Sequence, residues 1–206
     1  MTPQLLSALA LFGFASSITP GPNNTMLLAS GANFGLRASL PHMAGVAGGF
    51  ALLVLAVGLG LGGVFTAYPV LHTVLAWAGT LYLLYLAGRI AMTKGLSARK
   101  DGARPMRFVD AVIFQAVNPK GWAMALGAVT AYAPAESYFA NVLVVVLVFA
   151  AVNTPCILAW TAFGVSMRRF LDRPAVLRGF NIAMAALLVL SLIPTLRELA
   201  AHPGGA

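Results

Sequence analysis

The feature that most constrains this chain is the length of its uncharged stretches. No Lys, Arg, Asp or Glu occurs between Arg37 and Arg89, and Glu136 is the only charged residue between Lys120 and Arg168. Charged residues make up 9% of the chain, against about 25% in soluble domains. A soluble globule of this size needs far more polar surface. The sequence therefore indicates a polytopic membrane protein and argues against a soluble enzyme.

The net charge of +8 does not indicate a nucleic-acid partner, because the basic residues are confined to short segments. Such confinement is typical of loops between membrane spans, whereas a nucleic-acid-binding face spreads its cations over a helix or patch. The single cysteine, Cys156, excludes an intramolecular disulfide framework.

Six stretches are apolar and about 20 residues long, the length that crosses a bilayer as a helix. They run approximately over Leu5–Ala32, Leu40–Thr66, Val70–Met92, Val109–Tyr132, Phe139–Val165 and Phe180–Leu196. A membrane β-barrel would need alternating polar and apolar residues, and a run such as Val142–Ala151 does not alternate. We expect an all-α integral membrane protein with six transmembrane helices.

The loops predict an orientation. Basic residues gather after the first, third and fifth stretches, and the loops after the second and fourth contain none. The positive-inside rule then puts the basic loops in the cytoplasm and both termini in the periplasm. No stretch is polar enough for a soluble domain, so we expect residues 1–206 to form one transmembrane domain, with a cytoplasmic connector at about 93–108.

The first stretch is interrupted by Thr19-Pro20-Gly21-Pro22-Asn23-Asn24. Two prolines remove two backbone donors and leave carbonyls unpaired. Asn23 lies 14 residues before Arg37, or roughly 20 Å along a helix. The interruption is therefore inside the bilayer, where it persists only if it faces protein or a water-filled cavity.

The fourth stretch is interrupted by Asn118-Pro119-Lys120-Gly121. Lys120 lies 10 residues after Asp110, or about 15 Å into the span. A lysine at that depth is costly unless it is paired or hydrated. Either interruption alone is also explained by an ordinary proline kink. Both together favour a functional site.

The two breaks correspond in position. Each lies in the first helix of a three-helix half, about 1–92 and about 109–206, and three is odd, so the halves insert in opposite orientations. Broken helices at equivalent places of inverted repeats indicate a transporter binding site. Glycine pairs such as Gly45/Gly49 have a spacing that permits close helix packing and would allow a homodimer.

The segments ITPGPNNTMLLASGANFGLRASLPHMAGVAGG and AVNPKGWAMALGAVTAY, beginning at Ile18 and Ala116, are similar to the two signatures of the LysE/RhtB family of amino-acid exporters. The resemblance covers the whole chain in length and motif placement. It implies a bacterial inner-membrane secondary transporter that exports amino acids or close derivatives, driven by the proton motive force. The motif positions carried over are Pro20, Gly21, Pro22, Asn23, Asn118, Pro119 and Lys120.

An amino acid carries a carboxylate and an ammonium group, and unwound helix ends suit both. We expect Lys120 and the helix N-terminus after it to hold the carboxylate, and the freed carbonyls of the first break to accept from the ammonium. The alternative is that Lys120 only pairs with a backbone carbonyl and orients the break. The full set of predicted substrate-binding residues is Pro20, Gly21, Pro22, Asn23, Asn24, Gln115, Asn118, Pro119, Lys120 and Asn153.

Neutral amino acids are the favoured substrates, because the cationic side chain of a basic amino acid would need a buried carboxylate of the protein as its partner. Asp110 is the acidic residue nearest a span, and we assign it to interfacial pairing or helix capping, with proton coupling as the alternative. No metal or cofactor is expected. Rival functions are export of metal ions or other small solutes, and a non-transport role in membrane assembly; the spans hold few of the carboxylates, imidazoles and thiolates that bind metals.

Overall fold

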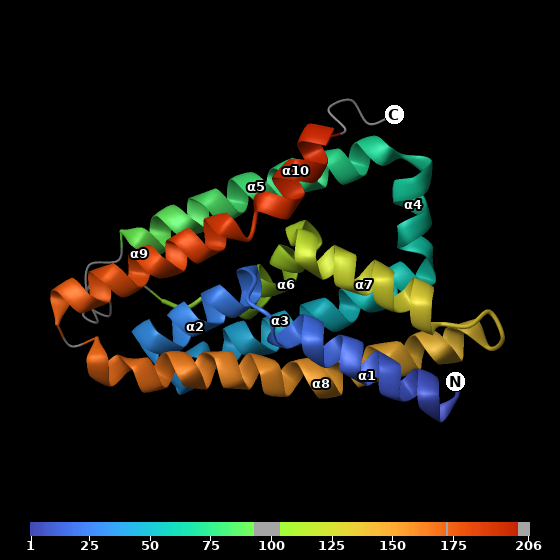
Figure 1. Cartoon of the computed structure of the whole chain (residues 1–206), viewed down its shortest axis with the longest axis horizontal. Helices are drawn as coiled ribbons and strands as arrows, with labels where there is room; N and C mark the ends of the chain where they lie inside the picture. The colour runs from blue at the N-terminus through green and yellow to red at the C-terminus, as the bar shows by residue number, and fades with distance from the viewer. Residues whose placement is uncertain (93–103, 172, 202–206) are drawn as a thin grey trace.

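A computed structural model of the chain describes residues 1–92, 104–171 and 173–201, and in these ranges the regular elements are helices (Figure 1). The first half contains α1 (Pro3–Ile18), α2 (Pro22–Phe34), α3 (Leu36–Ala56), the π-helical turn η1 (Val57–Leu61), α4 (Gly62–Ala67) and α5 (Pro69–Ala91). The second half contains α6 (Phe108–Val117), α7 (Pro119–Tyr132), α8 (Tyr138–Met167), the 3₁₀ turn η3 (Arg168–Phe170), α9 (Pro174–Leu190) and α10 (Ile193–Ala201).

Proline fixes where many of these helices begin. Pro3, Pro22, Pro69, Pro119 and Pro174 each stand in the first turn of a helix. Proline is tolerated there because the first amide hydrogens of a helix have no partner within it. The two interruptions predicted from the sequence thus become starting points of new helices.

Four helices are long and apolar enough to cross a membrane, namely Leu36–Val64, Thr73–Ala91, Tyr138–Phe170 and Pro174–Arg197. A fifth span is formed if α1 and α2, which meet at 56°, are taken together. Large apolar side chains such as Leu11 (70% exposed) and Leu147 (67% exposed) face outward. An all-helical membrane protein is therefore confirmed.

The predicted stretches differ from the helices in three places. The stretch 109–132 is divided into α6, of 10 residues, and α7, of 14 residues, neither of which is itself among the four long spans. The second stretch turns at Gly60, whose φ of 107° is open only to glycine without strain. The sixth begins earlier than expected, at Pro174, and α9 ends at Leu190 before the short helix α10.

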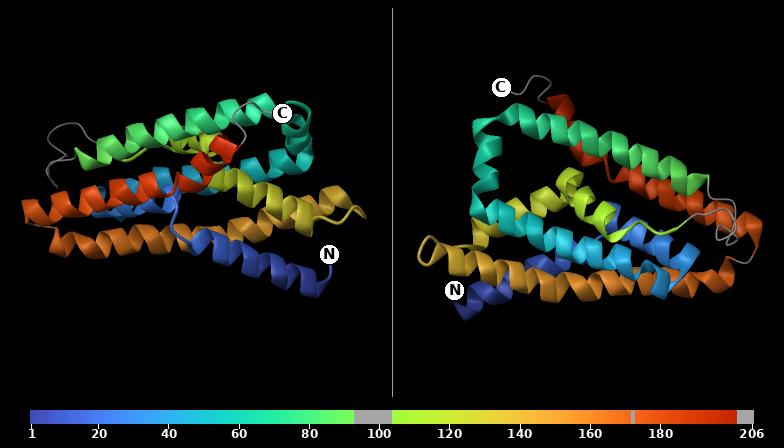
Figure 2. Two further views of the ribbon diagram at one scale, coloured as in Figure 1. Left: turned by 45° about the horizontal axis from the view of Figure 1, so that its top comes forward. Right: turned by 180° about the vertical axis from the view of Figure 1, so that it is seen from behind.

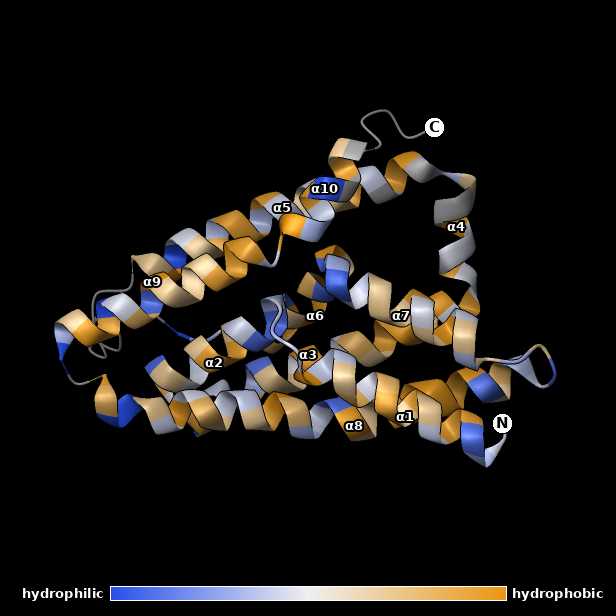
Figure 3. Ribbon diagram, in the orientation of Figure 1, coloured by the Kyte–Doolittle hydropathy of each residue, from blue (hydrophilic) through white to orange (hydrophobic). Residues whose placement is uncertain are grey.

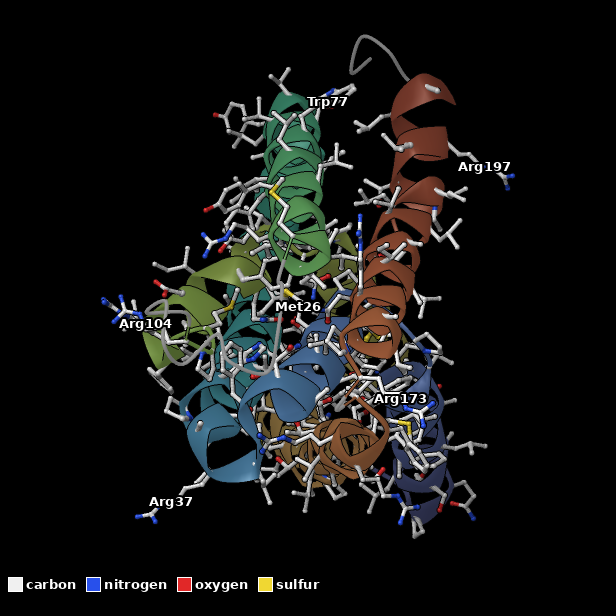
Figure 4. The ribbon with its side chains drawn as sticks, turned by 90° about the vertical axis from the view of Figure 1, so that its left-hand side faces the viewer. Met26, Arg37, Trp77, Arg104, Arg173 and Arg197 are labelled. Atoms are coloured by element: carbon white, nitrogen blue, oxygen red, sulfur yellow. The ribbon has the colours of Figure 1, made fainter. Side chains whose placement is uncertain are left out.

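The helix connections gather at two ends of the molecule. In Figure 1 and in the turned views of Figure 2, the α2–α3 turn, the end of α5 and the α8–α9 turn lie together at one end. The N-terminus, α4 and the α7–α8 loop lie at the other. Figure 4 looks onto the first end and shows Arg37, Arg104 and Arg173 around it. We call this the basic end. Colouring by hydropathy shows hydrophilic residues there and at the start of α7, with hydrophobic residues along most of the helices between (Figure 3).

Close contact between backbones holds the central helices together. A Cβ atom on Gly31 of α2 would collide with the carbonyl of Thr161 on α8, and one on Gly164 would collide with the carbonyl of Leu28. Gly45 and Gly49 bring α3 against α6 in the same way. This is the small-residue packing that membrane helices use. It fixes α2 and α6, the helices that border the two breaks, against the rest of the bundle.

Candidate functional site

The first break separates α1 from α2. Thr19 and Gly21 have extended backbones, so the carbonyls at the end of α1 lose their helical partners. Side chains replace those partners. The Asn24 amide donates to the carbonyl oxygens of Ser17 (2.7 Å) and Thr19 (2.8 Å). The Trp160 indole, from α8, donates to the carbonyl of Ile18 (3.1 Å). The freed carbonyls are therefore satisfied, as a membrane interior requires.

The second break separates α6 from α7 at Asn118, whose backbone is extended (φ −85°, ψ 104°). Its freed carbonyls are satisfied from close by in the chain. The Trp122 indole donates to the carbonyl of Ala116 (2.8 Å), and the backbone N–H of Asn118 donates to the carbonyl of Gln115 (3.3 Å). The second break is thus completed by its own helix pair.

Lys120 joins the two breaks. Its ammonium donates to the Thr19 carbonyl (2.9 Å), the Thr19 hydroxyl (2.9 Å) and the Pro20 carbonyl (3.3 Å). A Cβ atom on Gly21 would lie 2.7 Å from the Lys120 Cδ, so glycine is what lets the lysine approach. The contact matches the alternative in which Lys120 pairs with backbone carbonyls and orients the break.

Amide side chains also connect the breaks. The Asn23 amide donates to Gln115 Oε1 (2.9 Å), and the Gln115 amide donates in return to Asn23 Oδ1 (3.2 Å). Asn118 donates weakly to the same Gln115 oxygen (3.4 Å). Gln115 is 1% exposed, so this pair lies in the interior. The structure therefore brings Asn23, Gln115, Asn118 and Lys120 into one cluster.

A small cavity of about 30 Å³ lies at this cluster, and we call it the central cavity. Seven of the ten predicted substrate-binding residues line this cavity, including Asn153 of α8, whereas Pro20, Gln115 and Pro119 lie at the breaks without lining it. Its lining includes Ser17, Gly21, Asn23, Asn118, Lys120 and Asn153. Since small-molecule sites occupy roughly 300–1,000 Å³, the central cavity is too small for an amino acid in this conformation. Two buried lining atoms, Ser17 Oγ and Asn118 Oδ1, make no hydrogen bond within the described residues.

A larger cavity of about 390 Å³ lies toward the basic end, and we call it the vestibule. It is bounded by α2, α3, α5 and α6 together with residues 104–107. Asp110, predicted from the sequence as a candidate for proton coupling or capping, lies on this wall in the first turn of α6 and not at the breaks. His42 lines the vestibule and is 2% exposed.

The sequence did not reveal Thr19 and Trp160 as parts of the site. Thr19 belongs to the first break, and its hydroxyl and carbonyl oxygens accept hydrogen bonds from Lys120. Trp160 lies in an apolar helix 142 residues from its acceptor, Ile18. No pattern along the chain could have paired them, because the contact depends on how α8 packs against α1.

Comparison with known proteins identifies a family and several curated relatives. The family described as LysE type translocator matches residues 8–191. The cysteine/O-acetylserine efflux protein of Escherichia coli (strain K12) is 31% identical over 193 residues, which cover 92% of this chain and 96% of that protein. The protein of the same name from Shigella sonnei (strain Ss046) gives the same figures. No solved structure gives a significant match.

Proposed function

The chain belongs to the LysE type translocator family, and we propose from this premise that it exports neutral amino acids or close derivatives through the two broken helices. Membership makes it a multi-pass membrane transporter of a bacterial efflux family rather than an enzyme, and amino-acid efflux is the activity named for its relatives. A neutral substrate of the size of cysteine or O-acetylserine is the finer part of the proposal, and the relatives' names support it.

We propose that α6 and α7 cross the membrane as one broken span, which raises the number of spans to six. The halves 1–92 and 109–206 are then inverted repeats of a single domain. In support, α1–α2 and α6–α7 run in opposite directions between the two ends of the molecule (Figure 1). The basic end faces the cytoplasm in this arrangement, because Arg37, Arg104 and Arg173 lie around it, and both termini face the periplasm.

The observation that carries the mechanism is the bond from Lys120 to the carbonyls of Thr19 and Pro20. The ammonium of Lys120 occupies the acceptors that the ammonium of an amino acid would use. We propose that a substrate takes over these carbonyls and that its carboxylate pairs with the displaced Lys120 and with the N-terminus of α7. Lys120 then has both of the roles considered from the sequence: it pairs with backbone carbonyls when no substrate is bound, and it holds the carboxylate when a substrate is bound.

This exchange has a physical advantage inside a membrane. Without a substrate, Lys120 pairs with the carbonyls of Thr19 and Pro20, which would otherwise be unpaired in a medium that cannot hydrogen-bond to them. Once a substrate's ammonium group has displaced Lys120, the lysine is an isolated charge in the membrane unless the substrate also carries a carboxylate. A molecule that carries both charges satisfies both sets of groups, whereas an amine or an acid alone satisfies one. We propose that the proton motive force drives the cycle.

The test is flux in liposomes that contain the purified protein. Labelled O-acetyl-L-serine and L-cysteine should cross faster than in protein-free liposomes, and an imposed pH gradient should drive their accumulation. Lys120→Met should lower the rate at least tenfold, because a charge-assisted hydrogen bond is worth about 1.5–3 kcal/mol. Absence of flux for neutral amino acids by the unmodified protein would overturn the function. Full flux by a correctly inserted Lys120→Met variant would overturn the role of the lysine alone.

A further inference from the structure

We propose that the vestibule is a separate loading site, which binds a zwitterionic amino acid at the basic end before the substrate reaches the breaks. Arginine side chains on its wall receive the carboxylate, and Asp110 receives the ammonium. The inference rests on the proposed function and adds a second binding position to it.

Size separates the two cavities. The vestibule has about 390 Å³, which lies in the range of roughly 300–1,000 Å³ that small-molecule sites occupy. The central cavity has about 30 Å³. In this conformation an amino acid therefore fits the vestibule and does not fit between the breaks.

The charges on the vestibule wall match a zwitterion. Arg89 of α5, Arg104 and Arg107 supply guanidinium groups, and Asp110 of α6 supplies a carboxylate. The planar guanidinium pairs with carboxylates through two parallel hydrogen bonds. Arg89 is held at the wall by a hydrogen bond to the Tyr85 hydroxyl (2.8 Å). Both charges of an amino acid thus find opposite partners within one cavity.

Buried polar atoms without hydrogen-bond partners also support a binding site in the vestibule. Within the described residues, both ring nitrogens of His42 and the Oδ1 atom of Asn33 are buried and make no hydrogen bond. Both residues line the vestibule. Leaving such atoms unsatisfied is costly. Ser17 and Asn118, which line the central cavity, also have such an atom. In the described part of the chain, Thr80 is the only other residue that has one, and it lines neither cavity.

One face of α2 leads from the vestibule to the breaks. Asn33, Ser30 and Met26 line the vestibule, and Asn23 lies three residues further on the same helical face. Met26 is 5% exposed and lies in the interior when the molecule is viewed from the basic end (Figure 4). Beyond it stands the hydrogen-bonded pair of Asn23 and Gln115. Met26 and this amide pair therefore separate the loading site from the central cavity.

The test is equilibrium binding of two labelled probes to the detergent-purified protein, O-acetyl-L-serine and L-cysteine methyl ester. Arg89→Gln should weaken binding of the amino acid about tenfold and leave the ester unchanged, because the ester has no carboxylate. Asp110→Asn should weaken both probes, since both carry an ammonium group. Arg37→Gln, at the same end but off the vestibule wall, is the matched control and should keep both affinities within about twofold.

Lys120→Met distinguishes this inference from the proposed function. It should retain vestibule binding of O-acetyl-L-serine while losing flux, because Lys120 does not line the vestibule. Loss of all binding in Lys120→Met, or unchanged affinity in both Arg89→Gln and Asp110→Asn, would overturn the loading site. Failure of the unmodified protein to move any neutral amino acid would instead overturn the function, whatever the binding data show.

Discussion

The break between α1 and α2 and the break between α6 and α7 both start a new helix with a proline, but they satisfy their backbone carbonyls differently. The first relies on Lys120 of α7 and Trp160 of α8, in addition to its own Asn24. The second relies on Trp122, which follows it in the same helix pair. The first break is thus completed by distant parts of the chain, and the second is complete by itself.

This difference suggests a division of work between the breaks. A break that is capped by its own helix keeps its shape when the surroundings move. A break that is capped by a neighbouring helix loses donors when that helix moves, and it must then accept others. The first break is therefore the one that can exchange Lys120 for a substrate, and the second is the rigid support from which Lys120 extends.

Adding one methyl group to each break should give the largest contrast. A Cβ atom at Gly21 would lie 2.7 Å from Lys120 Cδ, so Gly21→Ala displaces the lysine. At Gly121 the nearest atom is Leu53 Cδ2 at 3.3 Å, the end of a side chain that can shift. We expect Gly21→Ala to lower the flux of O-acetyl-L-serine about tenfold and Gly121→Ala to lower it less than threefold. Equal losses of flux in the two variants would contradict the proposed difference between the breaks.

Removing one indole donor at each break should give a smaller contrast. Trp160→Phe deletes the bond to the Ile18 carbonyl, and Trp122→Phe deletes the bond to the Ala116 carbonyl. Each bond is worth about 1 kcal/mol. If all of this free energy is lost from the rate-limiting step of transport, the rate falls by a factor of about five. We expect the flux to fall by up to that factor in Trp160→Phe and by less than twofold in Trp122→Phe. A larger loss in Trp122→Phe would show that the second break is the sensitive one.

The amide pair connects the two breaks, and a double-mutant cycle measures the coupling between its two side chains. Asn23→Leu or Gln115→Leu leaves the other amide unpaired, whereas the double variant removes both partners. We expect the two single changes to destabilise by about 1–3 kcal/mol each and the double change to cost about 1 kcal/mol less than their sum. Thermal unfolding in detergent gives these values. Strict additivity would mean that Asn23 and Gln115 do not interact.

Much of this arrangement can be predicted from the sequence, because prolines and intramembrane polar residues leave clear signals. The breaks at Pro20–Pro22 and at Pro119 lie where they were expected, and the stretch predicted at Val70–Met92 is the helix Pro69–Ala91. The turn at Gly60 was missed, since glycine is equally common in continuous membrane helices.

The partners across the fold could not be predicted. The bond from Trp160 to Ile18 and the three bonds of Lys120 join residues at least 100 positions apart, and only the packing of α7 and α8 against α1 determines them. In the sequence, Arg104 and Arg107 belong to the basic connector that predicts the orientation of the helices in the membrane. Their place on a cavity wall depends on where α5 and α6 lie.

The meeting of the two breaks is tested most directly by cross-linking in native membranes. In a Cys156→Ala background, Thr19→Cys with Lys120→Cys should be joined by a short bifunctional thiol reagent, with the linked peptides identified by mass spectrometry, since the native side chains approach to 2.9 Å. Asn33→Cys with Asn181→Cys, whose native side chains lie 3.5 Å apart, is the positive control. The account predicts cross-links in both pairs and none in the single-cysteine variants. A cross-link in the control pair alone would contradict it.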